Sequence, residues 1–452
     1  MSNGQSLIGL KFLRLGMLAL AAGMFFGVIG GFQFLFPEFL RELLFTKTRP
    51  LHVSLVVSWI FLGAIGGIYY YLANQCRLKL FSERAANWHF WIFVVTGLTI
   101  LACYFAGKFG GREYFEYPAV LSIPIFLTWI MFGVNYFKTV FKSTEPWPVY
   151  YWMWGTGIVF FFITFTEAYL WLIPYFRDNM VREITVQWKS YGALTGSWNM
   201  LVYGTAIFVA SRISDDQETA HSKMAYGLYF LGFFNLIFGW AHHTYLVPSA
   251  PWIRTFAYAV SMTELFVLGK ILWDWRASLT SYQKNRHCNA YRFLFAADVW
   301  VFINLILALV ISVPAWNLIT HGTHITVAHA MGTTIGINSM ILLSSVFYVI
   351  RAELPMAAHA GCSRQVRFGY WVANVSLAVF FTALILAGLG KGLSDAGSFQ
   401  EMMLSIRPFL MAFVLSGVTL MIGIWIVLLY AVRLISLCLS PADRGAFAAD
   451  SI

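Results

Sequence analysis

The chain has 452 residues, of which 59% are hydrophobic, 18% aromatic and only 11% charged, and its mean hydropathy is +0.70. Soluble domains carry roughly 25% charged residues, so this composition excludes an ordinary soluble protein and indicates an integral membrane protein. The formal net charge of +10 does not indicate a nucleic-acid partner, because the Lys and Arg residues lie mostly in short loops, where they set membrane topology.

Hydrophobic runs predict an all-α integral membrane protein. Taking about 20 apolar residues per span, we expect about twelve transmembrane helices joined by short connections, so that residues 1–452 form a single transmembrane domain. The first apolar run has no small-residue cleavage site after it, and we expect a retained helix and not a signal peptide. The expected spans are 16–36, 51–73, 88–107, 118–138, 148–175, 190–211, 224–247, 251–274, 291–319, 322–350, 368–390 and 407–437.

Basic residues mark one set of alternate loops, which the positive-inside rule assigns to the cytoplasm together with both termini. Four of the five cysteines (Cys76, Cys103, Cys288, Cys362 and Cys438) fall in or beside these loops. The cytoplasm is reducing, so no disulfide framework is expected. No Cys-x-x-Cys-His motif is present, so the chain attaches no c-type haem of its own. The basic residues that set this orientation are Lys11, Arg14, Arg77, Lys79, Arg84, Lys138, Lys142, Arg276, Lys284, Arg286, Arg292, Arg364 and Arg367.

Two polar features are expected on the opposite, non-cytoplasmic side. His52 lies in the first turn of the second span, just after Pro50. A histidine there is either a satisfied interface residue or a functional intramembrane group. The loop after the third span contains Arg112, Glu113 and Glu116. These charges form either a solvated loop, a calcium site or a set of partners for haem propionates.

Four further polar residues lie in apolar spans. His242 and His243 are adjacent near the end of the seventh span. On a helix they point about 100° apart, so they share a metal only at the helix edge. Neutral imidazoles suit iron, copper and zinc, and structural packing is the alternative. Glu167 in the fifth span and Glu264 in the eighth are each a metal-site carboxylate, a proton carrier or an ion-pair partner.

The tenth span opens with His321-Gly-Thr-His324-Ile-Thr-Val-Ala-His329-Ala-Met331, which holds three of the ten histidines within eleven residues. His329 and Met331 are two positions apart, which is about 200° on a helix. We therefore expect them on opposite faces, where such a helix can stand between two haems and hold one on each side. The alternative is a histidine bonded to a neighbouring carbonyl and a methionine that fills a gap.

Together these features resemble the haem–copper oxidase superfamily, and within it the large subunit of cytochrome c-dependent bacterial nitric oxide reductase. The resemblance covers nearly the whole chain. Each motif alone is weak, but the combination is specific. It is carried by Leu51-His52 with Trp59 and Gly63, by Gly111-Arg112-Glu113 with Glu116-Tyr-Pro118, by His242-His243, by Glu264, and by His321-Gly-Thr with Ala328-His329.

The resemblance implies the cofactors and their ligands. His52 would hold a low-spin haem b, and His329 would hold a high-spin haem b3. His242 and His243 would be two of three histidines on a non-haem iron (or copper) beside the high-spin haem. Such a subunit would lie in the bacterial inner membrane and would reduce NO to N2O with electrons from a membrane-anchored cytochrome c subunit.

Two carboxylates also match the family. Glu116 matches a ligand of a calcium ion that bridges the haem propionates. Glu264 matches a carboxylate near the non-haem iron that supports metal binding or proton delivery.

Two departures from the family pattern bear on the metal centres. Met331 stands where the family has a second histidine, and a Met ligand would raise the potential of the low-spin haem. Tyr191 stands at the position of the third iron histidine and Thr195 at that of a glutamate ligand. Tyr191 is either a phenolate ligand or an interfacial aromatic beside Lys189. Glu167 is the available substitute for the missing glutamate.

The sequence is therefore consistent with three functions. The first is NO reduction with an altered metal site. The second is a diverged homologue with other gas chemistry, such as NO dismutation or O2 reduction, or with no activity at this centre. The third is a proton-coupled transporter. A terminal oxidase is disfavoured because Asn235 and Leu236 stand where related oxidases have a cross-linkable Tyr.

Overall fold

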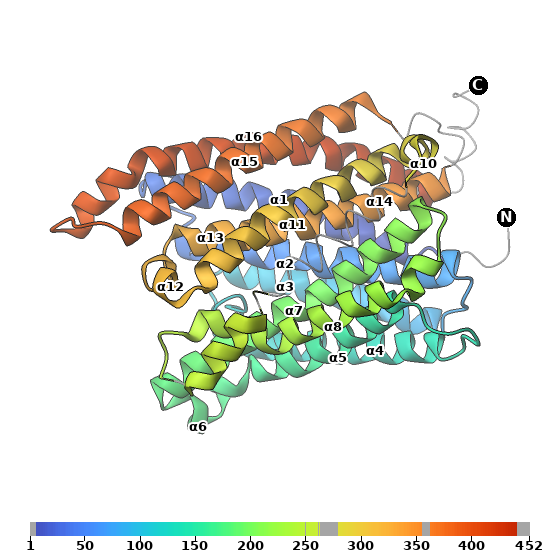
Figure 1. The fold of residues 1–452 in the computed structure, drawn as a ribbon, viewed down its shortest axis with the longest axis horizontal. Helices are drawn as coiled ribbons and strands as arrows, with labels where there is room; N and C mark the ends of the chain where they lie inside the picture. The colour runs from blue at the N-terminus through green and yellow to red at the C-terminus, as the bar shows by residue number, and fades with distance from the viewer. Residues whose placement is uncertain (1–5, 249, 261, 263–278, 355–361, 441–452) are drawn as a thin grey trace.

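Long apolar helices dominate the chain, because a helix satisfies its own backbone hydrogen bonds within a bilayer. The computed structural model describes residues 6–248, 250–260, 262, 279–354 and 362–440. Within these ranges the regular elements are all helical, with no strand, and eleven helical segments are long and apolar enough to cross a membrane. Their axes run roughly side by side (Figure 1). The expected all-α membrane fold is therefore confirmed.

Eleven of the twelve expected spans correspond to these segments. The eighth, expected at 251–274, is helical over 251–260 and lies mostly outside the described residues. The spans are α1 (Ile8–Leu35), α2 (Phe45–Tyr70) with η1 (Tyr71–Gln75), α3 (Glu83–Phe105), η2 (Ala119–Leu121) with α4 (Ser122–Val140), α5 (Val149–Glu167) with η3 (Leu170–Leu172), α7 (Met180–Ile213), α8 (Lys223–Phe238) with η5 (Gly239–Thr244), α11 (Cys288–Ser312), α13 (His324–Met331) with η6 (Gly332–Ser339) and α14 (Met340–Glu353), α15 (Arg364–Gly392) and α16 (Phe399–Leu439).

Short helices cap the two ends of the bundle. They are α6 (Pro174–Arg177), η4 (Glu218–His221), α10 (Ser281–Arg286) and α12 (Pro314–Thr320). Figure 1 shows α10 at one end and α6 and α12 at the other. The α10 end contains Arg77, Lys79 and Lys142 in its loops and Lys284 and Arg286 in α10, so the positive-inside rule assigns this end to the cytoplasm.

Glycines bring α1 and α2 into close contact. Gly9, Gly16 and Gly23 recur every seven residues, and a Cβ on each would lie 2.6, 3.1 and 2.9 Å from atoms of α2. Small residues at such spacing let two helix backbones approach within a membrane. The contact places the α1 backbone directly beside His52 of α2.

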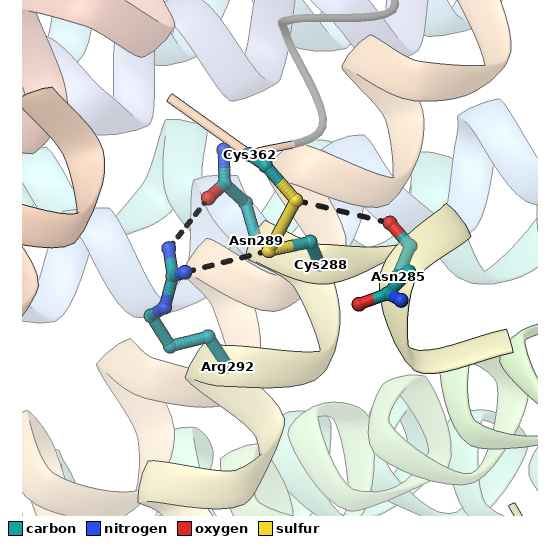
Figure 2. The surroundings of a disulfide bond; sticks show 5 residues. All are labelled: Asn285, Cys288, Asn289, Arg292 and Cys362. Atoms are coloured by element: carbon teal, nitrogen blue, oxygen red, sulfur yellow. Dashed lines mark hydrogen bonds between the residues drawn. A yellow bond between two sulfur atoms is a disulfide. The ribbon is translucent and has the colours of Figure 1, made fainter. Parts of the chain in front are cut away.

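A disulfide joins Cys288 to Cys362 (Figure 2), whereas Cys76 and Cys103 remain thiols. The expectation of no disulfide is therefore wrong for this pair. The two cysteines are 74 residues apart, and only the packing of the start of α11 beside the start of α15 brings them together.

Candidate functional site

One cavity of about 1100 Å³ collects most of the predicted site residues. It opens among α1, α2, α7, η5, α11, α13 and η6. Because internal polar groups at membrane depth are costly, histidines gathered around one cavity indicate a functional centre. The predicted residues that line the cavity are His52, Tyr191, His242, His243, His329 and Met331.

His52 is held in one orientation by the α1 backbone. Its Nδ1 lies 2.7 Å from the carbonyl oxygen of Gly23. A carbonyl only accepts, so Nδ1 carries the hydrogen and Nε2 keeps its lone pair, which is how a metal-binding imidazole is usually oriented. Because α2 begins at Phe45, His52 lies about two turns into the helix. The expectation that it lies in the first turn is wrong, because the helix starts before Pro50.

The His242–His243 pair lies on η5, a 3-10 segment that follows α8. The ring centroids are 4.1 Å apart, and the Trp188 ring stacks on His243 at 5.5 Å. Asn317 donates to the carbonyl of His242 at 3.1 Å. Both ring nitrogens of His242 and Nδ1 of His243 are buried and, among the described residues, have no hydrogen-bond partner. Buried polar atoms are nearly always satisfied, so these nitrogens fit a metal ion.

A turn at Gly322 sets the start of α13 and thereby the positions of His329 and Met331. Gly322 has φ +72°, a backbone conformation that favours glycine, and the side chain of Thr323 caps the helix by accepting from the N–H of Ile325. The His329 ring centroid is 6.2 Å from that of His242, and its Nδ1 is buried without a partner among the described residues.

The helix changes character directly after Met331. Residues Gly332–Ser339 form the π-helix η6 before the α-helical pattern resumes in α14. π-helical turns are rare and frequently mark functional sites. This feature was not predicted, because hydropathy does not distinguish a π-helix from an α-helix.

The loop after α3 turns its carboxylates towards the site. Arg49 of α2 pairs with Glu113 and, at 2.7 Å, with Glu116. Arg49 and Glu113 both line the cavity. Burial raises the pKa of Glu116, with Arg49 acting in the opposite direction, and its Oε2 is buried without a partner among the described residues. The loop is therefore an ordered charge cluster and not merely a solvated connection.

Tyr191 lines the cavity, whereas Glu167 does not. The Tyr191 hydroxyl accepts from Gln187 at 3.3 Å, and its ring contacts Tyr114. Both carboxylate oxygens of Glu167 bond to Lys189, which matches the ion-pair alternative. Glu264 lies outside the described residues. Within the described part of the chain, no three His, Cys, Asp or Glu side chains are already arranged to hold a metal.

His321 joins the histidine pair, although no role was predicted for it. Its ring centroid is 6.5 Å from that of His243 and 6.1 Å from that of Trp188, and its side chain contacts the His243 backbone. The cluster of three histidines in eleven residues was the available signal. The sequence could not show which of the three turns towards η5.

Residues 7–422 match the family model described as "Cytochrome C and Quinol oxidase polypeptide I". The chain belongs to this family. The suspected membership of the haem–copper oxidase superfamily is therefore confirmed, and with it a multi-pass protein of the bacterial inner membrane. Members of the superfamily are oxidoreductases that typically bind haems and a further metal.

The relatives carry two different names. The chain is 24% identical over 395 residues to a nitric oxide reductase subunit of Stutzerimonas stutzeri, covering 80% of each chain. It is also 24% identical over 424 residues to "Cytochrome c oxidase subunit 1" of Rhodobacter capsulatus, covering 84% of this chain and 75% of the relative. The fold is similar, with TM-score 0.75 and 15% identity, to that of a "heme-copper terminal oxidase dimer", covering 98% of this chain and 85% of the other.

Proposed function

We propose that this chain is the catalytic haem-binding subunit, with haem b, of a nitric oxide reductase-like complex, which reduces NO to N2O with electrons from a membrane-anchored cytochrome c subunit. The observation that carries the proposal is the convergence of imidazoles from three separate spans on one cavity, from α2, from η5 after α8, and from α13. The similarity to the nitric oxide reductase of Stutzerimonas stutzeri across 80% of both chains supports NO as the substrate.

In this proposal His52 and Met331 hold the low-spin haem b, and His329 holds the high-spin haem b3. The hydrogen bond from His52 to the Gly23 carbonyl fixes the ring so that Nε2 points away from α1. The bound irons supply electron transfer and gas binding. The protein fixes the ligand positions and surrounds the gas with apolar side chains, which keeps bulk water out.

The second metal, iron or copper, is proposed to bind His242 and His243. Neither Tyr191 nor Glu167 is oriented towards this pair, because the first bonds to Gln187 and the second to Lys189. We propose His321 as the third imidazole. Two imidazoles on one tetrahedral ion have ring centroids about 5 Å apart, so the 6.5 Å between His243 and His321 closes with a small side-chain rotation.

The charge cluster beside the haem cavity is proposed to serve the propionates. Arg49 supplies a guanidinium that bonds carboxylates in bidentate fashion. Glu113 and Glu116 hold it in place. The unpartnered Oε2 of Glu116 is the oxygen available to calcium, a cation that takes oxygen ligands.

The reaction is tested with full-length protein in detergent, a reduced cytochrome c or chemical donor, and anaerobic NO, with N2O measured by gas chromatography. O2 consumption is measured in parallel, because several relatives are named as oxidase subunits. Haem and metal are counted per chain. His329→Ala should lose turnover, whereas replacing the exposed His221 by Ala should not. O2 uptake without N2O would overturn NO reduction in favour of an oxidase, and a preparation without haem b would leave only transport.

A further inference from the structure

The Cys288–Cys362 disulfide connects two elements at the α10 end of the bundle. Cys288 is the first residue of α11, and Cys362 lies two residues before α15 begins. Their Cα atoms are 5.4 Å apart, within the range that a disulfide spans. The bond therefore fastens the corner between α10 and α11 to the start of α15 (Figure 2).

This end of the bundle carries the basic segments. α10 contains Lys284 and Arg286, and the first turn of α15 contains Arg364 and Arg367. The positive-inside rule assigns these residues to the cytoplasm. Disulfides there are rare, and those that form are usually transient, catalytic or redox-sensing. A reversible bond fits this position better than a permanent one.

The two sulfur atoms have different surroundings (Figure 2). Cys288 is half-buried, and Nη2 of Arg292 lies 3.4 Å from its sulfur, while Nη1 donates to Oδ1 of Asn289 at 2.8 Å and so holds the guanidinium in place. Cys362 is exposed, and its sulfur lies 3.8 Å from the carbonyl oxygen of Asn285. A nearby cation stabilises a thiolate, whereas a carbonyl oxygen does not. Cys288 is therefore the better leaving group, and Cys362 is the accessible point of attack.

We propose that Cys288 and Cys362 form a cytoplasmic thiol–disulfide exchange site, which a small thiol and its disulfide open and close. In reduction, a thiolate of the small thiol attacks the Cys362 sulfur and forms a mixed disulfide. The bond to Cys288 breaks, and Cys288 leaves as a thiolate beside Arg292.

A second small thiolate then attacks the small-thiol sulfur of the mixed disulfide and frees Cys362. Two small thiols have been oxidised to one disulfide, the cysteine pair has gained two electrons, and the two protons pass to the cysteine thiolates. Closure is the reverse reaction, with the small disulfide as the oxidant. The site is independent of the gas chemistry proposed for the haem cavity.

The test uses the folded full-length protein and glutathione as the probe. The protein is equilibrated anaerobically in buffers of increasing reduced-to-oxidised glutathione ratio, quenched with acid, alkylated and digested, and each cysteine is quantified by mass spectrometry. The pair should convert from mostly bonded to mostly reduced across the series, with the glutathione adduct on Cys362. Cys76 and Cys103 serve as internal thiol references. A bond that stays closed at every ratio, or a pair that stays reduced at every ratio, would overturn the proposal.

Variants test the asymmetry between the two sulfurs. Arg292→Gln should slow opening by glutathione roughly 3- to 10-fold, because the leaving thiolate loses its cation, and Arg292→Lys should retain most of the rate. Acid quenching early in the opening of the wild-type disulfide by glutathione should find more of the mixed disulfide on Cys362 than on Cys288. Equal amounts on the two cysteines would contradict the assignment of Cys362 as the point of attack.

The side of the membrane is tested separately. A membrane-impermeant maleimide should label the reduced pair in inverted vesicles and not in intact spheroplasts. Labelling from outside the spheroplasts would overturn the cytoplasmic assignment.

Discussion

Gly27 of α1 leaves the space that the His52 ring occupies, and replacing it with Ala should disturb the proposed low-spin haem site. A Cβ at Gly27 would lie 2.6 Å from Nδ1 and 2.7 Å from Cε1 of His52, whereas ordinary contacts begin at 3.4 Å. The ring must therefore move by about 0.8 Å, the difference between 3.4 and 2.6 Å. It must move away from α1, the helix that carries the Gly23 carbonyl.

That displacement weakens or removes the hydrogen bond that orients the imidazole. Nδ1 lies 2.7 Å from the Gly23 oxygen, and a shift of this size takes the pair to the limit of hydrogen bonding. The lost hydrogen bond costs about 1 kcal/mol, and overpacking adds roughly 1–3 kcal/mol. If the total of about 2–4 kcal/mol is expressed in haem binding, it corresponds to a roughly 30- to 1,000-fold loss of affinity for the haem that His52 is proposed to bind.

The assay is haem per chain by pyridine haemochrome, together with the low-spin bands of the reduced spectrum. Gly27→Ala should retain about one haem in place of two and lose the low-spin bands. Gly97→Ala is the matched control, because Gly97 lies within α3 and a Cβ there meets no atom within 4 Å. Two haems and an unchanged spectrum in Gly27→Ala would refute the role assigned to His52.

Three further predictions concern other parts of the chain. Met331→Leu should abolish the low-spin signal. Met331→His should keep the signal and lower the midpoint potential of that haem, because the thioether ligand of the wild type raises the potential. An unchanged signal and potential in both variants would show that Met331 is not a ligand. His321→Gln should reduce the amount of second metal per haem at least twofold, as measured by plasma mass spectrometry, whereas His324→Gln should leave it unchanged. Equal metal content in the two variants would show that His321 is not a ligand. Burial and two nearby arginines lower the pKa of His287 to about 4. Between pH 4 and 6.5, His287 therefore binds fewer protons in the folded protein than in the unfolded chain, where its pKa is about 6.5. For this residue the free energy of unfolding is highest above pH 6.5 and decreases as the pH falls towards 4. Thermal unfolding of His287→Phe should accordingly depend less on pH over this interval than that of the wild type.

The membrane architecture could be predicted because hydropathy reports it directly. Eleven expected spans correspond to observed ones, and the expected tenth span 322–350 is close to the observed His324–Glu353. Local geometry within the spans was less accessible. His242 and His243 lie on a 3-10 segment, where adjacent residues are about 120° apart, and not on the expected α-helix. Their orientation depends on tertiary contacts such as the stacking of Trp188 on His243, which no local pattern encodes.

The candidate site was predictable as a set of residue types and less so as a set of neighbours. Placing a histidine in an apolar span costs free energy, and His52 and His329 could therefore be identified from the sequence as candidate functional residues. The role of Glu167 could not be predicted in this way, because Glu167 of α5 forms an ion pair with Lys189 of α7. An intramembrane carboxylate indicates a function only when no cation lies opposite, and its partner on another helix cannot be read from spacing.

The substitution at Tyr191 is better understood from the neighbours of α7 than from the position itself. Trp188 lies about one turn before Tyr191 and provides the ring that stacks on His243. At Gly192, a Cβ would lie 2.3 Å from the Cβ of Trp240, so α7 is packed against η5 with no room between the two backbones. Trp188 of α7 already lies against one side of His243. The His321 imidazole approaches from the turn before α13, with its ring centroid 6.5 Å from that of His243. Under the proposed function, a Tyr in place of the family's α7 histidine therefore does not by itself remove the second metal, because the segment that carries the proposed haem ligand His329 also carries His321 close to the histidine pair.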